Sequence, residues 1–202
     1  MKEDKQAARR EAIIAATYEL LAESGYRATS MLAIARRAAA SNETLYRWYG
    51  NKQGLISEMV AQNALDVRTV LNLAIQKGAN PLDTLDKVGP LLLSLVTSEK
   101  AVLLNRAAAA EAAQDSSLGE AIASHGRNAV VPLLVQLFES AKQQGQLHFE
   151  QSRDIAEDYV TLLIGDWQIR RAIGSMPPLK PSQIKTRAKR AREKLVQLYG
   201  KL

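Results

Sequence analysis

The sequence predicts an all-α protein with a small N-terminal three-helix domain and a larger C-terminal helical domain. Strong helix formers such as Ala, Leu, Glu, Lys and Gln are abundant among its 202 residues, whereas aromatic residues make up only 5%. Apolar residues recur at helical spacing, and runs of β-branched residues are few. A chain of this length can bury a substantial core in two domains, which we place at residues 1–52 and 53–202.

The first two predicted helices are separated by Gly25. This glycine suits the position just after a helix, where a left-handed backbone ends the helical run. Thr29 and Ser30 are good N-caps for the second helix. That helix carries mostly small side chains over residues 32–35, which would let a neighbouring helix approach closely.

A third short helix is predicted after a tight turn at residues 38–40. Ser41 is a suitable N-cap, and Leu45 and Trp48, which are three residues apart, would face a small core. Polar and basic side chains would then remain on the solvent side. Two short helices joined by a tight turn, with the second presented to solvent, are typical of a helix-turn-helix DNA reader.

The solvent side of the third helix can enter the major groove, where Asn pairs well with adenine, Arg with guanine and Glu with cytosine. Base or near-base contacts are therefore expected from Asn42, Glu43, Thr44 and Arg47. Phosphate contacts through hydroxyl, indole or ammonium groups are expected from Thr29, Ser41, Tyr46, Trp48 and Lys52. Arg37 completes the predicted DNA-binding set. Trp48 could serve either the core or a phosphate, and a phosphate partner would explain the cation Lys52 near a helix start.

The remainder of the chain is predicted to form a series of amphipathic helices. A long connecting helix is expected over residues 52–76. The next helix should begin at Asn80-Pro81, and Gly89-Pro90 should kink or split it. Later helices are expected near residues 99–114, 118–141, 152–174 and 181–202.

The last two predicted helices indicate oligomerisation. Apolar residues in the final helix alternate by four and three, which is typical of a seam that needs a partner helix. Two such helices from each of two subunits would make a four-helix interface. The residues expected in this homodimer interface are Tyr159, Leu163, Ile173, Ala188, Leu195 and Leu198.

Charge is distributed unevenly along the chain. The net charge is +3 over residues 1–52, −4 over 53–179 and +7 over 180–202. The basic N-terminal part suits nucleic-acid binding. In the C-terminal part most Lys and Arg residues avoid the apolar seam, so a solvated helix face explains them better than contact with DNA or anionic lipid.

Several other classes of site are excluded by residue type. The chain has no cysteine, and neither His125 nor His148 has a His or carboxylate partner at helical spacing, so we expect no metal site and no cofactor. The N-terminus leads into an amphipathic helix, and no stretch approaches the ~18 apolar residues of a membrane helix. A cytoplasmic protein without a membrane partner is therefore expected.

The first 60 or so residues resemble the DNA-binding domain of the tetracycline repressor (TetR) family. The matching elements are residues 13–16, Leu20-Leu21, Gly25-Tyr26, Thr29-Ser30-Met31, Ile34-Ala35, Thr44-Leu45-Tyr46, Lys52 and Leu55. Two features depart from the family pattern, the turn between the second and third helices and the aromatic residue that closes the motif. Ala39 and Ala40 replace the usual Gly and Val of the turn, and Tyr49 replaces a common Phe. If position 39 needs a positive φ, Ala costs roughly 1 kcal/mol relative to Gly.

The resemblance also implies dimerisation through the last two helices and a ligand pocket in the C-terminal body. Residues 101–120 and 145–147 are loosely similar to the regulatory domains of AefR-like members. The residues expected to line the pocket are Leu95, Arg106, Leu134, Phe138 and Trp167. Arg106 could instead form an ion pair with Glu111 or Asp166, and we favour the ion pair over the pocket role. Trp167 could instead pack in the dimer seam, and we favour the seam.

Together these features indicate a homodimeric repressor whose reading helices enter successive major grooves, about 34 to 36 Å apart, on a near-palindromic operator. A small-molecule effector in the body would favour a state that no longer fits DNA, with the helix over 52–76 as the lever. Three alternatives are a DNA-binding dimer without an effector, a helical adaptor for proteins, and an enzyme. The enzyme is disfavoured because the chain offers no supported nucleophile and base, metal cluster or phosphate loop.

Overall fold

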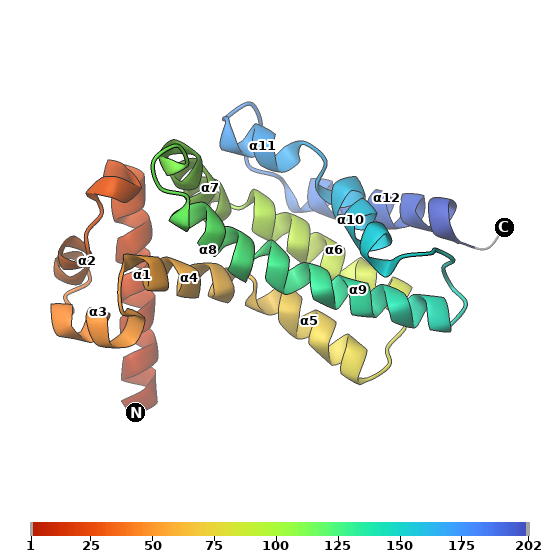
Figure 1. Cartoon of the computed structure of the whole chain (residues 1–202), viewed down its shortest axis with the longest axis horizontal. Coiled ribbons are helices and arrows are strands. Elements are labelled where there is room, and N and C mark those ends of the chain that lie inside the picture. Colours follow the sequence, from red (N-terminus) through yellow and green to blue (C-terminus); the bar gives the residue numbers. More distant parts are fainter. Residues whose placement is uncertain (1, 201–202) are drawn as a thin grey trace. The chain divides into compact units, whose positions relative to one another are not determined.

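The computed structural model describes residues 2–200, which form twelve helices and no β-strand (Figure 1). This confirms the predicted all-α class. The helices are α1 (Lys2–Ala28), α2 (Met31–Arg37), α3 (Asn42–Tyr49), α4 (Lys52–Asn63), α5 (Leu65–Gln76), α6 (Pro81–Thr97), α7 (Glu99–Glu111), α8 (Ser117–His125), α9 (Arg127–Gln143), α10 (Ser152–Ile164), α11 (Trp167–Ala172) and α12 (Pro181–Tyr199).

Three segments predicted as single helices are each divided in two. α8 and α9 are separated at Gly126, which has φ −97° and ψ −96°, and α10 ends at Gly165, which has a φ of 53°. Glycine adopts such backbone angles at little steric cost. α4 and α5 are separated at Ala64, and no residue there signals a break in the sequence. The expected lever over residues 52–76 is therefore two helices.

The chain packs as two compact units that are not continuous in sequence. The first, which we call the head, comprises residues up to Gln62 together with Leu103–Ala123. The second, the body, comprises Asn63–Val102 and the chain from Ser124 onward. α7 thus begins in the body and ends in the head. The domain boundary placed at residue 52 stays a prediction.

The head is built around α1, which α2 contacts, and α3 follows against α2 (Figure 1). Gly25, with a φ of 77°, interrupts α1 as predicted. The core of this unit is formed by apolar side chains from α1 to α4 and from α7 and α8: Ile13, Leu20, Leu21, Tyr26, Met31, Ile34, Ala35, Leu45, Leu55, Ile56, Met59, Val60, Leu104, Ala107 and Leu118. Residues 103–123 therefore complete the core of the unit that carries the helix-turn-helix.

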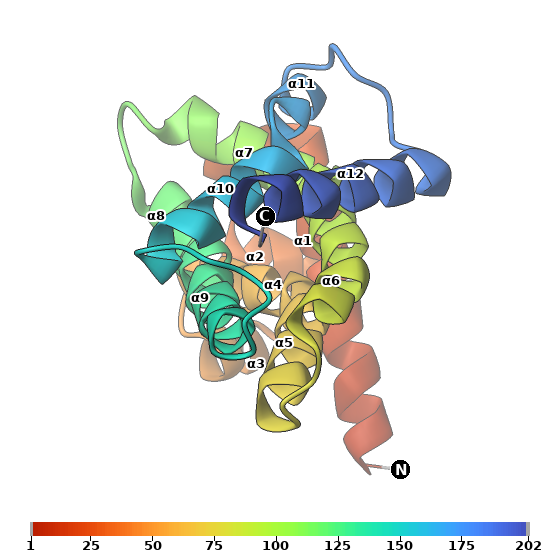
Figure 2. The ribbon, with the colours of Figure 1, turned by 90° about the vertical axis from the view of Figure 1, so that its right-hand side faces the viewer.

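The body is a bundle in which α5 packs against α6 and α9, and α12 packs against α6 and α10 (Figure 2). α6 runs through Gly89-Pro90 as one helix, so the predicted split does not occur. Close packing explains the glycine, because a Cβ there would lie 2.7 Å from Tyr159 Oη and 3.1 Å from Ala188 Cβ. Gly89 therefore lets α10 and α12 approach α6.

No helix in residues 2–200 has, by itself, the length and apolar composition needed to span a membrane. α6 and α7 meet those criteria only when taken together, and they are bent by 50° at the break between them. In the body, Leu85, Val88, Leu92 and Leu93 of α6 are buried in the bundle core, and three further apolar residues of this helix are partly buried against it.

Candidate DNA-reading head

Two serine caps define the helices of the helix-turn-helix. The Ser30 side chain accepts a hydrogen bond from the Ala33 backbone N–H (3.1 Å) at the start of α2. The Ser41 side chain accepts from the Thr44 N–H (3.1 Å) at the start of α3, and the two hydroxyls lie 2.7 Å apart. Each cap satisfies a backbone donor that the first helical turn leaves unpaired. Both N-caps confirm what the local sequence predicts.

The turn between α2 and α3 is a Schellman motif with alanine in the left-handed position. The Ala40 N–H donates to Ala35 O (2.9 Å), and the Ala39 N–H donates to Arg36 O (3.3 Å). Ala39 has a φ of 48°, and among the described residues it is the only non-glycine with a positive φ. α5 and α9 end with the same pair of bonds, but with Gly78 and Gly145 in the left-handed position. Ala39 therefore holds a strained conformation at the joint that sets the angle between α2 and α3.

The residues predicted to contact DNA divide by exposure. Ser41, Asn42, Glu43, Tyr46 and Arg47 are exposed on α3 and its cap. By contrast, Thr29 and Thr44 are buried, and the Thr29 hydroxyl donates to Gly25 O (2.7 Å). These two threonines lie in the packing of the head, whereas the other five are available to a groove or a phosphate.

Trp48 lies between core and surface. It is half-buried, its ring meets Tyr49 edge-on with centroids 6.3 Å apart, and the Arg10 guanidinium lies 5.5 Å from its centroid. The indole therefore joins α3 to α1, and Arg10 brings a cation beside it that the sequence pattern does not indicate.

Lys52, at the start of α4, turns toward α1. Its Nζ donates to Tyr26 O (2.7 Å) and lies 3.8 Å from the centroid of the Tyr26 ring. Burial lowers the pKa of the ammonium group, and the carboxylates of Glu111 and Asp115 act in the opposite direction. Lys52 is thus an internal contact of the head.

Arg37, in the last turn of α2, is held by two carboxylates of α1. Its Nη1 and Nη2 donate to the two oxygens of Glu23 (2.9 and 2.8 Å), and Nη1 also donates to Glu19 (3.1 Å). The hydrogen bond from Arg37 lowers the pKa of the Glu23 carboxyl. Bidentate arginine–carboxylate geometry of this kind fixes orientation better than a single ion pair does.

The turn between α7 and α8 is tied to the end of α1 by polar contacts. Arg27 hydrogen-bonds to Gln114 and pairs with Glu111, with Nε 3.5 Å from the carboxylate. The Tyr26 side chain hydrogen-bonds to that of Ser117, and burial raises the pKa of its phenol. The residue pattern gives no signal for these contacts, because the partners are about 90 residues apart in the chain.

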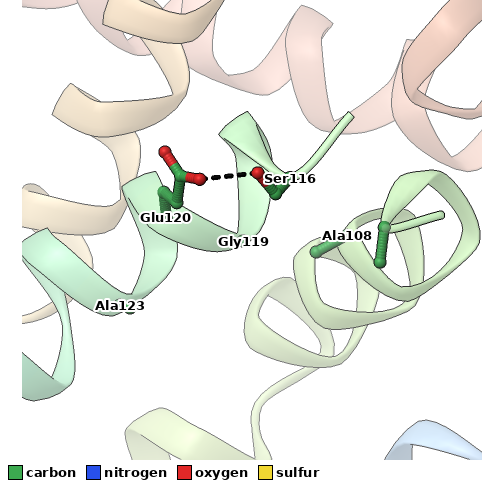
Figure 3. Close-up of a pocket in the computed structure, with 6 residues that line it drawn as sticks. Ala108, Ser116, Gly119, Glu120 and Ala123 are labelled. Atoms are coloured by element: carbon green, nitrogen blue, oxygen red, sulfur yellow. Dashed lines mark hydrogen bonds between the residues drawn. The ribbon is translucent and has the colours of Figure 1, made fainter. Parts of the chain in front are cut away.

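An open groove of about 310 Å³ is lined by residues of α7, of this turn and of α8 (Figure 3). It is lined mainly by small side chains, and Glu120 accepts a hydrogen bond from Ser116 at 2.5 Å. The residues around the groove are Ala108, Ala112, Ser116, Gly119, Glu120 and Ala123. None of them was predicted to bind a ligand.

Four of the five residues predicted to line a ligand pocket lie in the body. Leu134 and Phe138 are fully buried, and the half-buried Leu95 and Trp167 pack against the same core. Arg106 is exposed and belongs to the head unit. The structure thus groups the four apolar residues of the predicted set in the core of the body, and Arg106 is not part of that core.

The buried arginine of the body is Arg171, which the sequence analysis did not identify. Its Nε donates to Thr97 O (3.1 Å), its Nη1 donates to Met176 O (2.9 Å), and Nη2 pairs with Glu99. Two of these partners lie 72 and 74 residues away, so helical spacing could not reveal them. Arg171 joins α11 to the corner between α6 and α7.

The six residues predicted for the dimer interface also divide by exposure. Tyr159, Leu163, Ala188 and Leu195 are buried within one chain, where the Tyr159 ring packs edge-on against Phe138 with centroids 5.9 Å apart. Ile173 and Leu198 are 68% and 65% exposed. Those two side chains, and Ile169 at 58%, are apolar and largely exposed to solvent.

Two family models match this chain. The model for bacterial regulatory proteins of the tetR family matches residues 13–59, which cover the helix-turn-helix. The model for the C-terminal domain of AefR-like transcriptional repressors matches residues 83–201, more than half of the chain.

Two HTH-type transcriptional regulators of Bacillus subtilis (strain 168) are similar in sequence. YvkB is 24% identical over 172 residues, which cover 83% of this chain and 88% of YvkB. YdeS is 40% identical over 55 residues, which cover 27% of this chain and only 28% of YdeS.

Solved structures share the fold. A TetR-family regulator from Mesorhizobium loti MAFF303099 superposes with a TM-score of 0.77 at 21% identity, over 96% of this chain and 98% of that one. The flavonoid-responsive regulator FrrA gives 0.69 at 21%, over 95% and 97%. Thermus thermophilus FadR, in complex with lauroyl-CoA, gives 0.59 at 18%, over 93% of each chain. The chain therefore belongs to the TetR family of bacterial transcriptional regulators, DNA-binding proteins rather than enzymes, and its C-terminal part is that of the AefR-like repressors.

Proposed function

We propose that the protein is a cytoplasmic homodimeric repressor that binds a near-palindromic operator and leaves it when a small-molecule effector binds. The observation that carries this proposal is the exposed side of α3, which is capped by Ser41 and presents Asn42, Glu43 and Arg47 to solvent. These residue types can read base edges in the major groove. We expect Tyr46 and Ser41, which are also exposed, to contact the phosphates beside them.

A dimer would supply two such reading helices. Two-fold symmetry would set them in successive major grooves, about 34 to 36 Å apart. The exposed Ile173 and Leu198, near the ends of α11 and α12, are our candidates for the apolar part of this interface. Equilibrium sedimentation should give twice the 22.2 kDa chain mass, and Leu198→Asp should reduce that mass toward one chain.

The effector part of the proposal draws on two structural neighbours. FrrA is flavonoid-responsive, and FadR was solved with lauroyl-CoA, whose acyl chain is apolar. In this chain Leu95, Leu134, Phe138 and Trp167 gather apolar side chains in the body. We propose that an apolar effector enters among them and displaces the ends of α6 and α7, since α7 runs from the body into the head.

The first test is selection of genomic DNA fragments by the purified protein at near-physiological salt. Recovery of one inverted repeat supports a dimeric sequence-specific regulator. Recovery of unrelated fragments, with an affinity that collapses as salt rises, would refute sequence-specific reading and favour an architectural protein.

The effector requires a separate test, because a constitutive DNA-binding dimer is the competing proposal. Gel shifts on the selected repeat would be made with flavonoids and acyl-CoAs at saturating concentrations. Release by one compound class supports the switch, which needs a difference in affinity between the two states rather than binding alone. Binding that no compound alters favours the constitutive regulator.

A further inference from the structure

We propose that Arg37 and Lys52 are positioning residues, which hold α2 and α4 against α1 instead of contacting DNA phosphates. The proposal rests on the proposed function of the head and alters the set of residues expected to neutralise phosphate charge. It follows from what each of the two cations already touches within the head.

Arg37 is surrounded by more negative charge than it carries. The guanidinium makes a bidentate contact with Glu23 and a further hydrogen bond to Glu19, all between 2.8 and 3.1 Å. One arginine and two carboxylates have a net charge of −1, so these three side chains together add no positive charge to attract a phosphate. Releasing Arg37 to reach DNA would also leave both carboxylates without their partner. The geometry instead fixes the end of α2, within the Schellman motif, onto α1.

Lys52 contacts the end of α1 just after its interruption at Gly25. Tyr26 O follows the interruption at Gly25 and accepts hydrogen bonds from the Thr29 N–H (3.2 Å) and from Lys52 Nζ (2.7 Å). Carbonyl groups at a helix C-terminus carry partial negative charge and favour a cation. The ammonium also lies over the Tyr26 ring, at 3.8 Å. Both contacts join α4 to α1, and a phosphate would have to compete with them.

Arg36 offers a matched comparison, because it precedes Arg37 on the same helix. It is exposed, and among the described side chains no carboxylate pairs with it. Removing the charge of Arg36 therefore changes the electrostatic field of the head without breaking an ion pair. Removing the charge of Arg37 changes the field and also breaks its ion pairs.

Glu23→Gln gives the sharpest test, because the two roles predict opposite signs. If Arg37 is a positioning residue, Glu23→Gln should weaken binding to the selected operator several-fold, although it removes a negative charge. Arg37→Gln should weaken binding similarly, and the double variant should be no weaker than either single variant. If Arg37 contacts a phosphate, Glu23→Gln should strengthen binding, and that result would overturn the proposal for Arg37.

The salt dependence of binding separates the roles for both cations. The logarithm of the DNA-binding constant falls linearly with the logarithm of the salt concentration, and loss of one phosphate contact makes this slope about 0.9 less negative for duplex DNA. Arg37→Gln and Lys52→Met should weaken binding with the slope of the unaltered protein. A slope reduced by about 0.9 in either variant would show that the residue contacts a phosphate.

Hydrogen exchange tests positioning without DNA, so the failure of the proposed function would not obscure it. Amides at the end of α2 should exchange several-fold faster in Arg37→Gln and Glu23→Gln, and those of residues 26–30 should do so in Lys52→Met. Arg36→Gln should leave both regions unchanged. Unchanged exchange in the first three variants would overturn the proposal even if the protein binds DNA, whereas a lack of DNA binding with faster exchange would overturn only the proposed function.

Discussion

Replacing Ala39 with glycine should stabilise the head. An L-residue in the left-handed region costs roughly 1–2 kcal/mol, and Ala39 has a φ of 48°. Glycine removes that strain but gains conformational freedom in the unfolded chain, which offsets about 0.4–1 kcal/mol. Ala39 is exposed, so its methyl group contributes little packing. The net gain for Ala39→Gly is therefore about 0.8 kcal/mol, from the midpoints of these ranges.

The assay can be made specific to the head, because one of the two tryptophans lies in each unit. In a Trp167→Phe background, urea unfolding followed by fluorescence reports on Trp48 alone. Ala39→Gly should raise the urea midpoint without changing the m value. Ala40→Gly is the matched control, since its φ is not in the positive region, and it should lower the midpoint. A midpoint for Ala39→Gly at or below that of the parent would refute the assignment of strain to this turn.

Three further predictions concern the body. Gly89→Ala should destabilise the body by about 1–3 kcal/mol in urea unfolding, because the added methyl group would meet Tyr159 Oη at 2.7 Å. Tyr159→Phe should recover part of this loss. No recovery would mean that the clash lies elsewhere. Arg171→Met should cost roughly 2 kcal/mol by Trp167 fluorescence, since the buried Thr97 carbonyl and the partly buried Met176 carbonyl lose their donor. A loss below ~0.5 kcal/mol would contradict the role of Arg171 at the α6–α7 corner. The hydrogen bond to Asp158 raises the pKa of Tyr199 to about 12, so the stabilisation by this bond is complete below pH 10 and is lost as the pH rises through 12. The free energy of unfolding should therefore fall over this pH window, and Tyr199→Phe should reduce the fall. An equal dependence on pH in the variant and the parent would count against the bond.

The sequence predicts those parts of the head that depend on residues a few positions apart. Ser30 and Ser41 cap their helices through bonds to the third residue along, and Gly25 breaks α1 by its own backbone freedom. The possible strain at Ala39 could also be foreseen, because the turn itself calls for a left-handed residue. These features are local, so residue type and spacing determine them.

Features that depend on distant partners could not be predicted in the same way. Arg37 and Lys52 look like free cations in the sequence, yet their partners lie 14 to 26 residues away on α1. Arg106 and Arg171 both stand among apolar residues in the sequence, but only Arg171 is buried. Similarly, the amphipathic spacing of Tyr159 and Leu195 indicates a buried face without showing whether the same chain or a partner covers it.

The shared core of the head limits how freely this reading unit could be exchanged between proteins. Leu104, Ala107 and Leu118 come from α7 and α8, which match the C-terminal family model, yet they are buried with α1 to α4. A chimera that joins a foreign helix-turn-helix at residue 62 would set these side chains against a surface that did not evolve with them. A new DNA specificity grafted onto α3 alone should therefore be tolerated better than a transplant of α1 to α4, and substitutions in α7 and α8 should accompany substitutions in α1 to α4 during divergence.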